Sequence, residues 1–450
     1  MIGTAILVVG VGVVLTLAVG LRILQRRFDP FDPSVIFFLA WGVMFVVRPA
    51  AILIRGDTNF YGVDIGSTLD RAVFLGLLGA VGFIVGYHLP VGRRLARAAP
   101  GPPGPYASST AVAAAFVVSA LGMLALALIL LPHGGLHAVD TFVSGRSMAF
   151  DQILAQSTSY LWWSSLLVVP AGLAGLAIAL VDPKPLTIVS AVVLLALALF
   201  RTLPIGNRIF LLTFVGGIIV FAYLHADRRP GLVGLVVGLG LALFVSDAIV
   251  NFRYPDTRSN LSAALHGIVS TPSRVFAPLT KGPDAEMAPA LAGALRVVPG
   301  TLQYRYGGAT FGDLVRRPIP RQWWPDKPQP PGRQVVAVVW PLALARGSFD
   351  PAFTPLLYFF WDFGLAGVFV GMALYGVSMR LLFEYFVRYR GNVVAQLLFA
   401  SGLWYLVVAV RHDPAGVFVQ AVVLFVPLIA IFAVARRRAS RVARHEPDRG

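Results

Sequence analysis

The chain has 450 residues, of which 57% are hydrophobic and 13% charged, and its formal net charge is +16. Soluble domains carry about 25% charged residues, so this composition excludes an ordinary soluble protein and indicates a polytopic membrane protein. Cysteine is absent, which excludes disulfides, zinc thiolates and iron–sulfur clusters. Most of the excess of positive over negative charge lies in short loops and in the tail, so it indicates membrane topology rather than nucleic-acid binding.

A membrane-spanning helix needs about 20 predominantly apolar residues. By this measure we expect an all-α membrane protein with about eleven spans, forming one domain over residues 1–450. The N-terminus lacks a charged segment and a small-residue cleavage site, so we interpret it as the first span and not as a signal peptide. The expected spans are 2–23, 34–54, 71–89, 109–131, 159–181, 187–202, 208–225, 231–252, 353–379, 392–410 and 416–435.

Positively charged residues predict the orientation of these spans. Every second loop carries Lys or Arg, and short loops of this kind remain in the cytoplasm. The C-terminus, with its basic tail 436–450, is then cytoplasmic and the N-terminus is extracytoplasmic. The cytoplasmic cations before the tail are Arg22, Arg26, Arg27, Arg93, Arg94, Arg97, Lys184, Arg228, Arg229, Arg388 and Arg390.

The extracytoplasmic loop 253–352 is far longer than the others. It carries about twelve Lys and Arg against six Asp and Glu, an excess that an anionic ligand would explain. Within it, we expect residues 288–298 to form a short helix lying on the membrane. Residues 311–334 concentrate prolines, five cations and the pair Trp323-Trp324, which predicts a stiff, irregular loop suited to holding an anion. The alternative is a tryptophan anchor at the lipid headgroups with solvated arginines.

Residues 319–328, IPRQWWPDKP, contain a Pro-Arg followed by Trp-Pro-x-Lys-Pro. In this pattern the chain resembles the Wzy-type oligosaccharide repeat-unit polymerases, bacterial enzymes that extend O-antigen, capsule and exopolysaccharide chains. Three shorter segments resemble further motifs of the family: Gly206-Asn207-Arg208, residues 361–367 (WDFGLAG), and Arg411-His412-Asp413, where His replaces a Gly. The resemblance is strongest from about residue 200 to 420. This family and the O-antigen ligases belong to the membrane-embedded glycosyltransferases of the GT-C type.

The resemblance implies transfer of a growing glycan from undecaprenyl diphosphate to a hydroxyl of the next lipid-linked repeat unit. It implies no metal and no other cofactor, and a site on the outer face of the bacterial cytoplasmic membrane. The expected partners are the lipid-linked donor and acceptor and membrane lipids, with no nucleic acid. A chain-length regulator and a flippase are candidate partners.

This reaction requires that the departing diphosphate is stabilised. Arginine suits this task because its planar fork binds phosphate oxygens in pairs and stays charged. The alternative is that the same cations only anchor helix ends at the headgroups. The expected diphosphate ligands are Arg208, Arg321 and Arg411, then Lys327 and Arg333, and third Arg253, which ranks with Arg201.

The acceptor hydroxyl must also lose a proton, and three residues are candidates for this step. His412 could accept the proton and Asp413 could orient another group, or Asp413 with Pro414 could simply cap a turn. Asp362 is an acid within an apolar span, so it is either functional or paired for packing, and Asp247 has the same ambiguity. Trp323 and Trp324 could stack on sugar rings, as could Trp340 and Trp361, although tryptophans more often lie at the membrane interface.

Three functions therefore compete. The polymerase is favoured by the Trp-Pro-x-Lys-Pro segment. An O-antigen-type ligase would use the same chemistry on a different acceptor. A transporter or flippase of lipid-linked sugars would place charged residues deep within several spans, whereas here most charge lies at span ends and in one loop.

Overall fold

The computed structural model describes residues 2–24, 28–133, 135, 159–202, 208–231, 234, 238, 280, 285–319, 323–345 and 351–443. This part of the chain is mostly helical, with almost no sheet. Eight of its helices are long and apolar enough to cross a membrane, and two shorter apolar helices accompany them. Ten of the expected spans coincide with these helices within a few residues at most ends. The remaining one, 231–252, falls almost wholly outside the described residues, as does Asp247.

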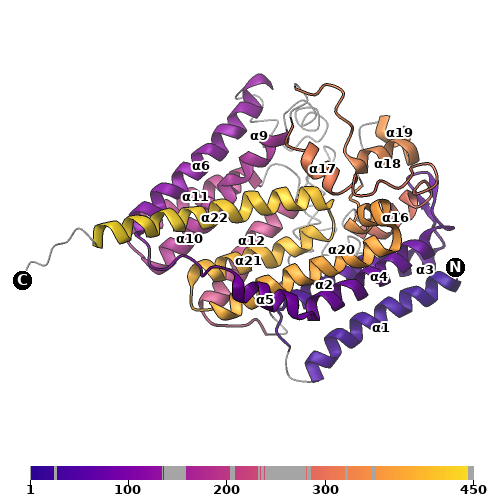
Figure 1. Ribbon diagram of the computed structural model, residues 1–450, viewed down its shortest axis with the longest axis horizontal. Helices are drawn as coiled ribbons and strands as arrows, with labels where there is room; N and C mark the ends of the chain where they lie inside the picture. Colours follow the sequence, from indigo (N-terminus) through magenta and orange to yellow (C-terminus); the bar gives the residue numbers. More distant parts are fainter. Residues whose placement is uncertain are drawn as a thin grey trace, which may run out of the picture.

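Residues 2–98 contain three of the long apolar helices. Figure 1 shows α1 at the edge of the bundle, with α2 and α4 beside it. The helices are α1 (Ile2–Leu24), a second span made of α2 (Pro33–Gly42), the π-helix η1 (Val43–Val47) and α3 (Arg48–Arg55), then α4 (Leu69–His88) and α5 (Pro90–Ala98). A two-residue antiparallel hairpin, β1 (Asn59–Phe60) and β2 (Val63–Asp64), connects α3 to α4, with Phe60 opposite Val63.

The middle of the chain forms the second group of spans. They are α6 (Ser108–Leu130) with the 3₁₀ turn η2 (Leu131–His133), then α9 (Ser159–Ser164), η3 (Ser165–Leu167) and α10 (Val168–Val181) in succession, then α11 (Pro185–Thr202) and α12 (Arg208–His225). The described residues of the long loop form four short helices: α16 (Met287–Ala294), α17 (Phe311–Arg316), α18 (Pro331–Val339) and α19 (Pro341–Ala345). The chain ends with α20 (Pro355–Arg388), α21 (Val393–Ala409) and α22 (Pro414–Ala443).

Local sequence signals explain where several spans begin. The Asp32 carboxylate accepts a hydrogen bond from Ser34 N at 2.9 Å and caps α2. Thr354 caps α20 in the same way, and Asn392 caps α21. Each of these polar side chains satisfies a backbone N–H that the first helical turn leaves without a partner.

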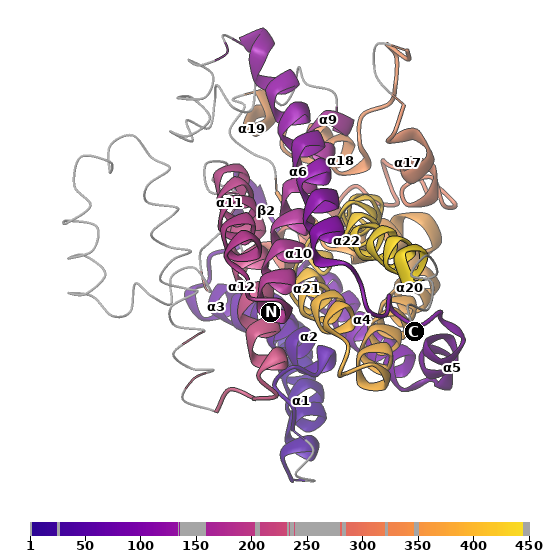
Figure 2. The same ribbon diagram turned by 90° about the vertical axis from the view of Figure 1, so that its left-hand side faces the viewer.

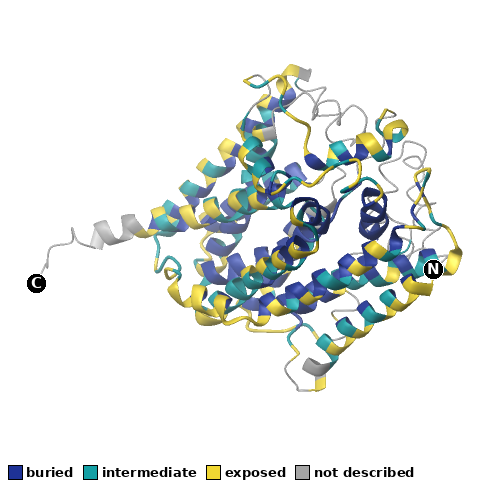
Figure 3. Cartoon of the chain, turned by 45° about the vertical axis from the view of Figure 1, so that its right-hand side comes forward, coloured by how far each residue is buried: buried dark blue, intermediate teal, exposed yellow. Residues whose placement is uncertain are grey.

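Buried side chains divide between two hydrophobic clusters, so the bundle has two packed halves. One cluster joins α1, α2, α4, α16, α18 and α20, and the other joins α6, α10, α11, α12, α21 and α22. Figure 3 shows buried residues along the inward helix faces and exposed ones outside, as expected where lipid covers the apolar outer surface. Glycines let α4 and α20 approach closely: a Cβ at Gly82 would lie 2.6 Å from Phe369 O.

Loops meet at two opposite ends of the bundle. At the end that carries the β1–β2 hairpin, called the hairpin end below, Trp340 Nε1 donates to Phe60 O at 3.1 Å. At the other end, called the tail end, Arg229 pairs with Asp29 at 3.1 Å and Asn392 donates to Pro103 O at 3.0 Å. Helices α16 to α19 lie at the hairpin end, whereas the last turns of α22 extend past the tail end (Figure 1).

The short helix expected on the membrane surface is instead in the protein interior. Every residue of α16 is buried, and Gly293 packs against the ring of Trp340. Thr68 Oγ1 donates to Ala292 O at 2.7 Å and so ties α16 to the start of α4. The expectation was wrong because residues 287–294 are small or apolar on all sides, and a helix without a polar face is stable when buried.

Candidate active site

The proline-rich segment 311–334 is only partly irregular. Residues Phe311–Arg316 form α17, and residues from Pro331 onward form α18. A fully irregular loop was therefore a wrong prediction at both ends. Prolines begin only at residue 318, so the residues before it can form a helical turn, and Pro331 occupies the first position of α18, where its missing N–H costs nothing.

Helix α20 is broken at Phe363 and Gly364. Gly364 has φ +62° and ψ −145°, a backbone conformation that is open almost only to glycine. The break leaves carbonyl groups without their helical partners, and the preceding loop supplies replacements. Arg305 N donates to Trp361 O at 3.0 Å, and Tyr306 N donates to Asp362 O at 3.2 Å. The segment around residues 303–310 is therefore held against the break.

Asp362 anchors the same segment with its side chain. Its carboxylate is fully buried and accepts hydrogen bonds from Ala309 N at 2.8 Å, Thr310 N at 2.9 Å and Thr310 Oγ1 at 2.6 Å. Three donors satisfy most of what a buried carboxylate requires. In this arrangement Asp362 positions the loop that leads into α17.

Aromatic side chains surround the break, and most of them are exposed. Phe363 lies beside Gly307, and Tyr304 lies beside Gly364. Tyr306 is 79% and Phe311 66% exposed. By contrast Trp340 and Trp361 are buried in the core, where their indole N–H groups bond to backbone carbonyls, so neither can stack on a sugar as considered from the sequence. Exposed rings of this kind provide a surface for sugars or for lipid headgroups.

Arg317 joins the loop to the turn between α21 and α22. Its guanidinium pairs with Asp313, which lies in α17, at 2.5 Å. It also pairs with Asp413 at 2.7 Å. Asp413 also accepts from Gly416 N at 2.6 Å and so caps α22. Asp413 therefore caps a helix and also holds an arginine, and its role in orienting a group for proton transfer stays a prediction. Figures 1 and 2 show α17 beside the start of α22.

The pKa values of Arg305 and Arg317 shift in opposite directions. Burial lowers the pKa of Arg305, and the neighbouring Arg316 adds to that effect. Burial also lowers the pKa of Arg317, but the carboxylates of Asp413 and Asp313 outweigh it, so the pKa of Arg317 is raised. Arg305 lies over the ring of Trp361, with 4.4 Å from Cζ to the ring centroid, and bonds Gln334 in α18. Both guanidinium groups are charged at neutral pH.

His412 lies in the turn between Arg411 and Asp413 and is half-buried, as they are. Burial first, and then the charges of Arg411 and Arg317, lower the pKa of His412 from its usual 6.5 to about 4. The imidazole is therefore neutral at physiological pH and carries one nitrogen able to accept a proton. The residues that the structure brings together are Arg305, Asp313, Arg316, Arg317, Arg411, His412 and Asp413, called the hairpin-end cluster below.

The remaining candidates in the described part have different surroundings. Lys327 Nζ donates to Arg317 O at 3.2 Å and to Ile319 O at 2.8 Å, so it fixes the loop backbone. Arg333 is exposed in the first turn of α18. Trp323 is 82% exposed, and Trp324 is half-buried. Trp323 is therefore the tryptophan of this segment most open to a ligand.

Three expected diphosphate ligands fall outside what the structure describes. Arg253 and Arg321 lie outside the described residues, and Arg208 begins α12 but its side chain is not among those described. Of the three first-ranked diphosphate ligands, Arg208, Arg321 and Arg411, only Arg411 has a described side chain. Arg201 is fully buried at the end of α11, where its Nε donates to Ser165 Oγ at 2.7 Å. Its guanidinium stacks on Trp162 and belongs to the packing of α9 and α11.

From the sequence alone, Arg316 and Arg317 count among the five cations of segment 311–334 without an individual role, and Arg305 is not selected. Arg316 Nη2 donates to Gly308 O at 2.8 Å and helps to close the loop over the break. A signal was present in the run Tyr304-Arg305-Tyr306 with Gly307 and Gly308 after it, a cation between aromatics next to a flexible turn. Within the described ranges, no three His, Asp or Glu side chains converge as metal ligands.

Comparison of the chain with protein-family models, with curated proteins and with solved structures finds no match.

Proposed function

We propose that the chain is a membrane glycosyltransferase that polymerises oligosaccharide repeat units linked to a lipid diphosphate. The observation that carries this proposal is the ion pair of Arg317 with Asp413, which spans 96 residues of sequence. It ties together two of the segments that resemble the Wzy-type polymerases. Lys327 of the Trp-Pro-x-Lys-Pro segment bonds the Arg317 carbonyl, and Asp413 completes the Arg-His-Asp turn.

A third resembling segment lies against the same loop. The stretch 361–367 contains the α20 break, and its carbonyls and the Asp362 carboxylate hold residues 305–310. Segments that resemble one family at separate places in the sequence thus contact one loop at one end of the bundle. This is what a single active site built from those segments would require.

The chemistry follows from the charges. The acceptor hydroxyl oxygen attacks the anomeric carbon, the bond from that carbon to the diphosphate oxygen breaks, and the lipid diphosphate leaves with the bonding electrons. Arginines bind the departing oxygens, and Arg411 is the member of the hairpin-end cluster that the sequence also selects for this role. The proton of the hydroxyl must pass to a base, and His412 is the neutral imidazole beside these cations.

Diphosphate binding would make His412 a better base. Two of the three causes that lower its pKa are the charges of Arg411 and Arg317. An anion on these arginines would offset their charge, and the pKa of His412 would rise toward neutrality. Substrate binding would therefore activate the proton acceptor only when the leaving group is in place.

We infer the orientation from the loop charges. The tail end carries the arginine-rich short loops, which remain in the cytoplasm. The hairpin end, with its cluster, then lies outside the bacterial cytoplasmic membrane, where lipid-linked repeat units are polymerised. A reporter fused after Gly300 is expected outside, and one fused after Arg438 inside.

One observation favours the transporter alternative. Broken helices near charged residues form substrate sites in many transporters, and α20 is broken beside Asp362. In those sites the freed backbone groups face the substrate. Here the Trp361 and Asp362 carbonyls and the Asp362 carboxylate accept hydrogen bonds from the protein itself, which favours a structural break.

Deletion of the gene in its native host tests the proposal. Surface glycans limited to a single repeat unit would support a polymerase. Free polymer that is not joined to its anchor would indicate a ligase instead. Lipid-linked repeat units retained on the cytoplasmic side would indicate a flippase, and unchanged glycans would contradict all three functions.

A further inference from the structure

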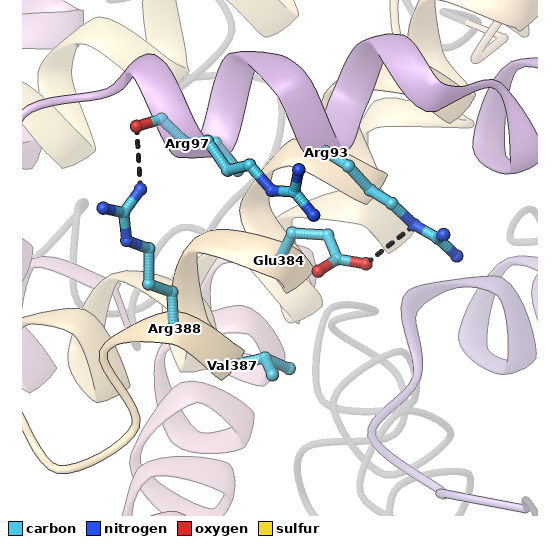
Figure 4. A pocket seen from close by; sticks show the side chains of 6 residues that line it. Arg93, Arg97, Glu384, Val387 and Arg388 are labelled. Carbon is cyan, nitrogen blue, oxygen red and sulfur yellow. Dashed lines mark hydrogen bonds and ion pairs between the residues drawn. The ribbon is translucent and has the colours of Figure 1, made fainter.

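A second cluster of cations lines an open cavity at the tail end, remote from the hairpin-end cluster. The cavity has a volume of about 440 Å³ and lies between α5 and the last turns of α20. Figure 4 shows the side chains around it. The lining residues are Arg93, Ala96, Arg97, Glu384, Val387 and Arg388.

Positive charge is in excess around this cavity. Arg93 Nε pairs with Glu384 at 3.2 Å, and the same carboxylate pairs with Arg380 from within α20. Figure 4 shows the Arg97 guanidinium directed toward Glu384, whereas Arg93 faces the carboxylate with its Nε and its terminal nitrogens point away. Among the described residues, nothing pairs with the Arg97 guanidinium, although its carbonyl accepts from Arg388 Nη1 at 2.7 Å. The one lining carboxylate, Glu384, is therefore already paired with Arg93 and Arg380, while the cavity is lined by three arginines, Arg93, Arg97 and Arg388.

The cavity lies where the lipid headgroups are expected, at the membrane surface next to the end of α4. The span α4 ends at His88 and α5 begins at Pro90, so α5 lies where that span leaves the membrane. Val91 and Leu95 are 41% and 47% exposed on a helix that also carries exposed arginines, a pattern typical of interfacial helices. Gly92 allows α5 to pack closely, because a Cβ there would lie 2.8 Å from Arg380 Cβ.

We propose that the cavity between α5 and α20 binds a phosphate group, presented either by the headgroup of an anionic phospholipid or by a soluble phosphate ester. Arginine forks bind phosphate oxygens in pairs, and basic pockets beside membrane helices bind anionic headgroups. A volume of about 440 Å³ is in the range of small-ligand sites. The exposed Val91 and Leu95 lie on the opposite side of α5 from Arg93 and Arg97, where they would hold the helix against the acyl region. This site does not depend on glycosyl transfer at the hairpin end.

The test uses the full-length chain in a neutral detergent and native mass spectrometry of bound lipid. We expect phosphatidylglycerol to bind more tightly than phosphatidylcholine, and Arg97→Gln to weaken phosphatidylglycerol binding on the order of 10-fold. Arg97→Gln is the key variant because, among the described residues, the exposed Arg97 guanidinium makes no hydrogen bond or ion pair that the fold would lose. Arg94→Gln is the matched control, since Arg94 is exposed on the same helix but does not line the cavity.

A second variant acts in the opposite direction. Glu384→Gln removes the competing carboxylate, so it should tighten binding of the phosphate group. Inorganic phosphate added at millimolar concentration distinguishes the two sources: a soluble ester is favoured if it displaces the lipid, and a headgroup if it does not. Equal weakening by Arg94→Gln and Arg97→Gln, or no preference for phosphatidylglycerol together with no phosphate binding, would overturn the site.

Discussion

Arg317 and Asp413 form an ion pair at 2.7 Å that joins the loop helix α17 to the first turn of α22. Their side chains are 16% and 21% exposed, so the pair is largely removed from solvent. Gly416 makes room for it, because a Cβ at that position would lie 2.7 Å from Arg317 Nη1. A charge pair of this kind depends on both partners, since loss of one leaves the other buried without full compensation.

Asp413→Asn isolates the charge of this pair. Asparagine caps a helix about as well as aspartate, so the start of α22 should remain intact while the bond to Arg317 weakens. We expect glycan polymerisation to fall sharply, with a loss of about 1–3 kcal/mol in stability. Glycan chain length in the complemented host and thermal unfolding of the purified protein measure the two effects.

Lys184→Gln provides the control for this charge removal. It breaks the exposed pair of Lys184 with Asp182, in which the lysine is 71% exposed, and surface pairs contribute little. Wild-type chain length in Asp413→Asn would remove the Arg317–Asp413 pair from the proposed site.

Gly364→Ala should disrupt the α20 break. The conformation at φ +62° and ψ −145° is costly for any residue with a Cβ, by about 1–3 kcal/mol. We expect a lower thermal midpoint and reduced activity, because the segment around residues 303–310 would lose its backbone partners. Gly20→Ala in α1 is the control, since a Cβ there meets nothing within 4 Å. Equal thermal midpoints for Gly364→Ala and the wild type would show that the break is not strained.

The long apolar helices could be predicted from the sequence because a continuous apolar stretch of about 20 residues is enough to locate them. The break in α20 could not, although its glycine is visible at position 364. A glycine in an apolar span is usually a packing residue, and the groups that satisfy this break come from residues 305–310, far away in the sequence. Only the tertiary structure brings these donors to the carbonyls of Trp361 and Asp362, which the break leaves without helical partners.

The candidate site was predictable in its segments but not in its individual residues. Residues 311–334 and the Arg-His-Asp turn were both selected, and the structure brings described parts of both together. Adjacent Arg316 and Arg317 look equivalent in sequence, yet one bonds the Gly308 carbonyl and the other two carboxylates. Likewise Trp323 is exposed whereas Trp361 is buried, and the sequence alone does not distinguish these two positions.

Asp362→Asn should destabilise the loop. The carboxylate accepts from two backbone N–H groups and a hydroxyl, and an amide would turn its NH₂ toward at least one of these donors. We expect a loss on the order of 2–4 kcal/mol, because buried donors would be left unsatisfied. Thermal unfolding and limited proteolysis within residues 303–319 measure the effect. Asp326→Asn, at an exposed position, is the control, and equal behaviour of the two variants would contradict the anchoring role of Asp362.

His412 should make the protein sensitive to acid between about pH 6.5 and pH 4. Its pKa in the folded chain is lowered to about 4, so in this range the unfolded chain binds a proton that the folded chain does not. The stabilising contribution is thus fully present above pH 6.5 and is lost as the pH falls through the folded pKa. The shift of the His412 pKa corresponds to at most about 3 kcal/mol in the free energy of unfolding. Thermal midpoints from pH 7.5 to 4 should fall in the wild type and fall less in His412→Gln.

A lipid diphosphate analogue adds a second test of the same residue. If the anion binds at Arg411 and Arg317, it offsets two of the charges that lower the pKa of His412, so the pKa should rise. The fall of the thermal midpoint at acid pH that is attributed to His412 should then be smaller when the analogue is present. In His412→Gln, the analogue should not change how the thermal midpoint depends on pH. An unchanged pH profile in the wild type with the analogue bound would place the diphosphate away from this turn.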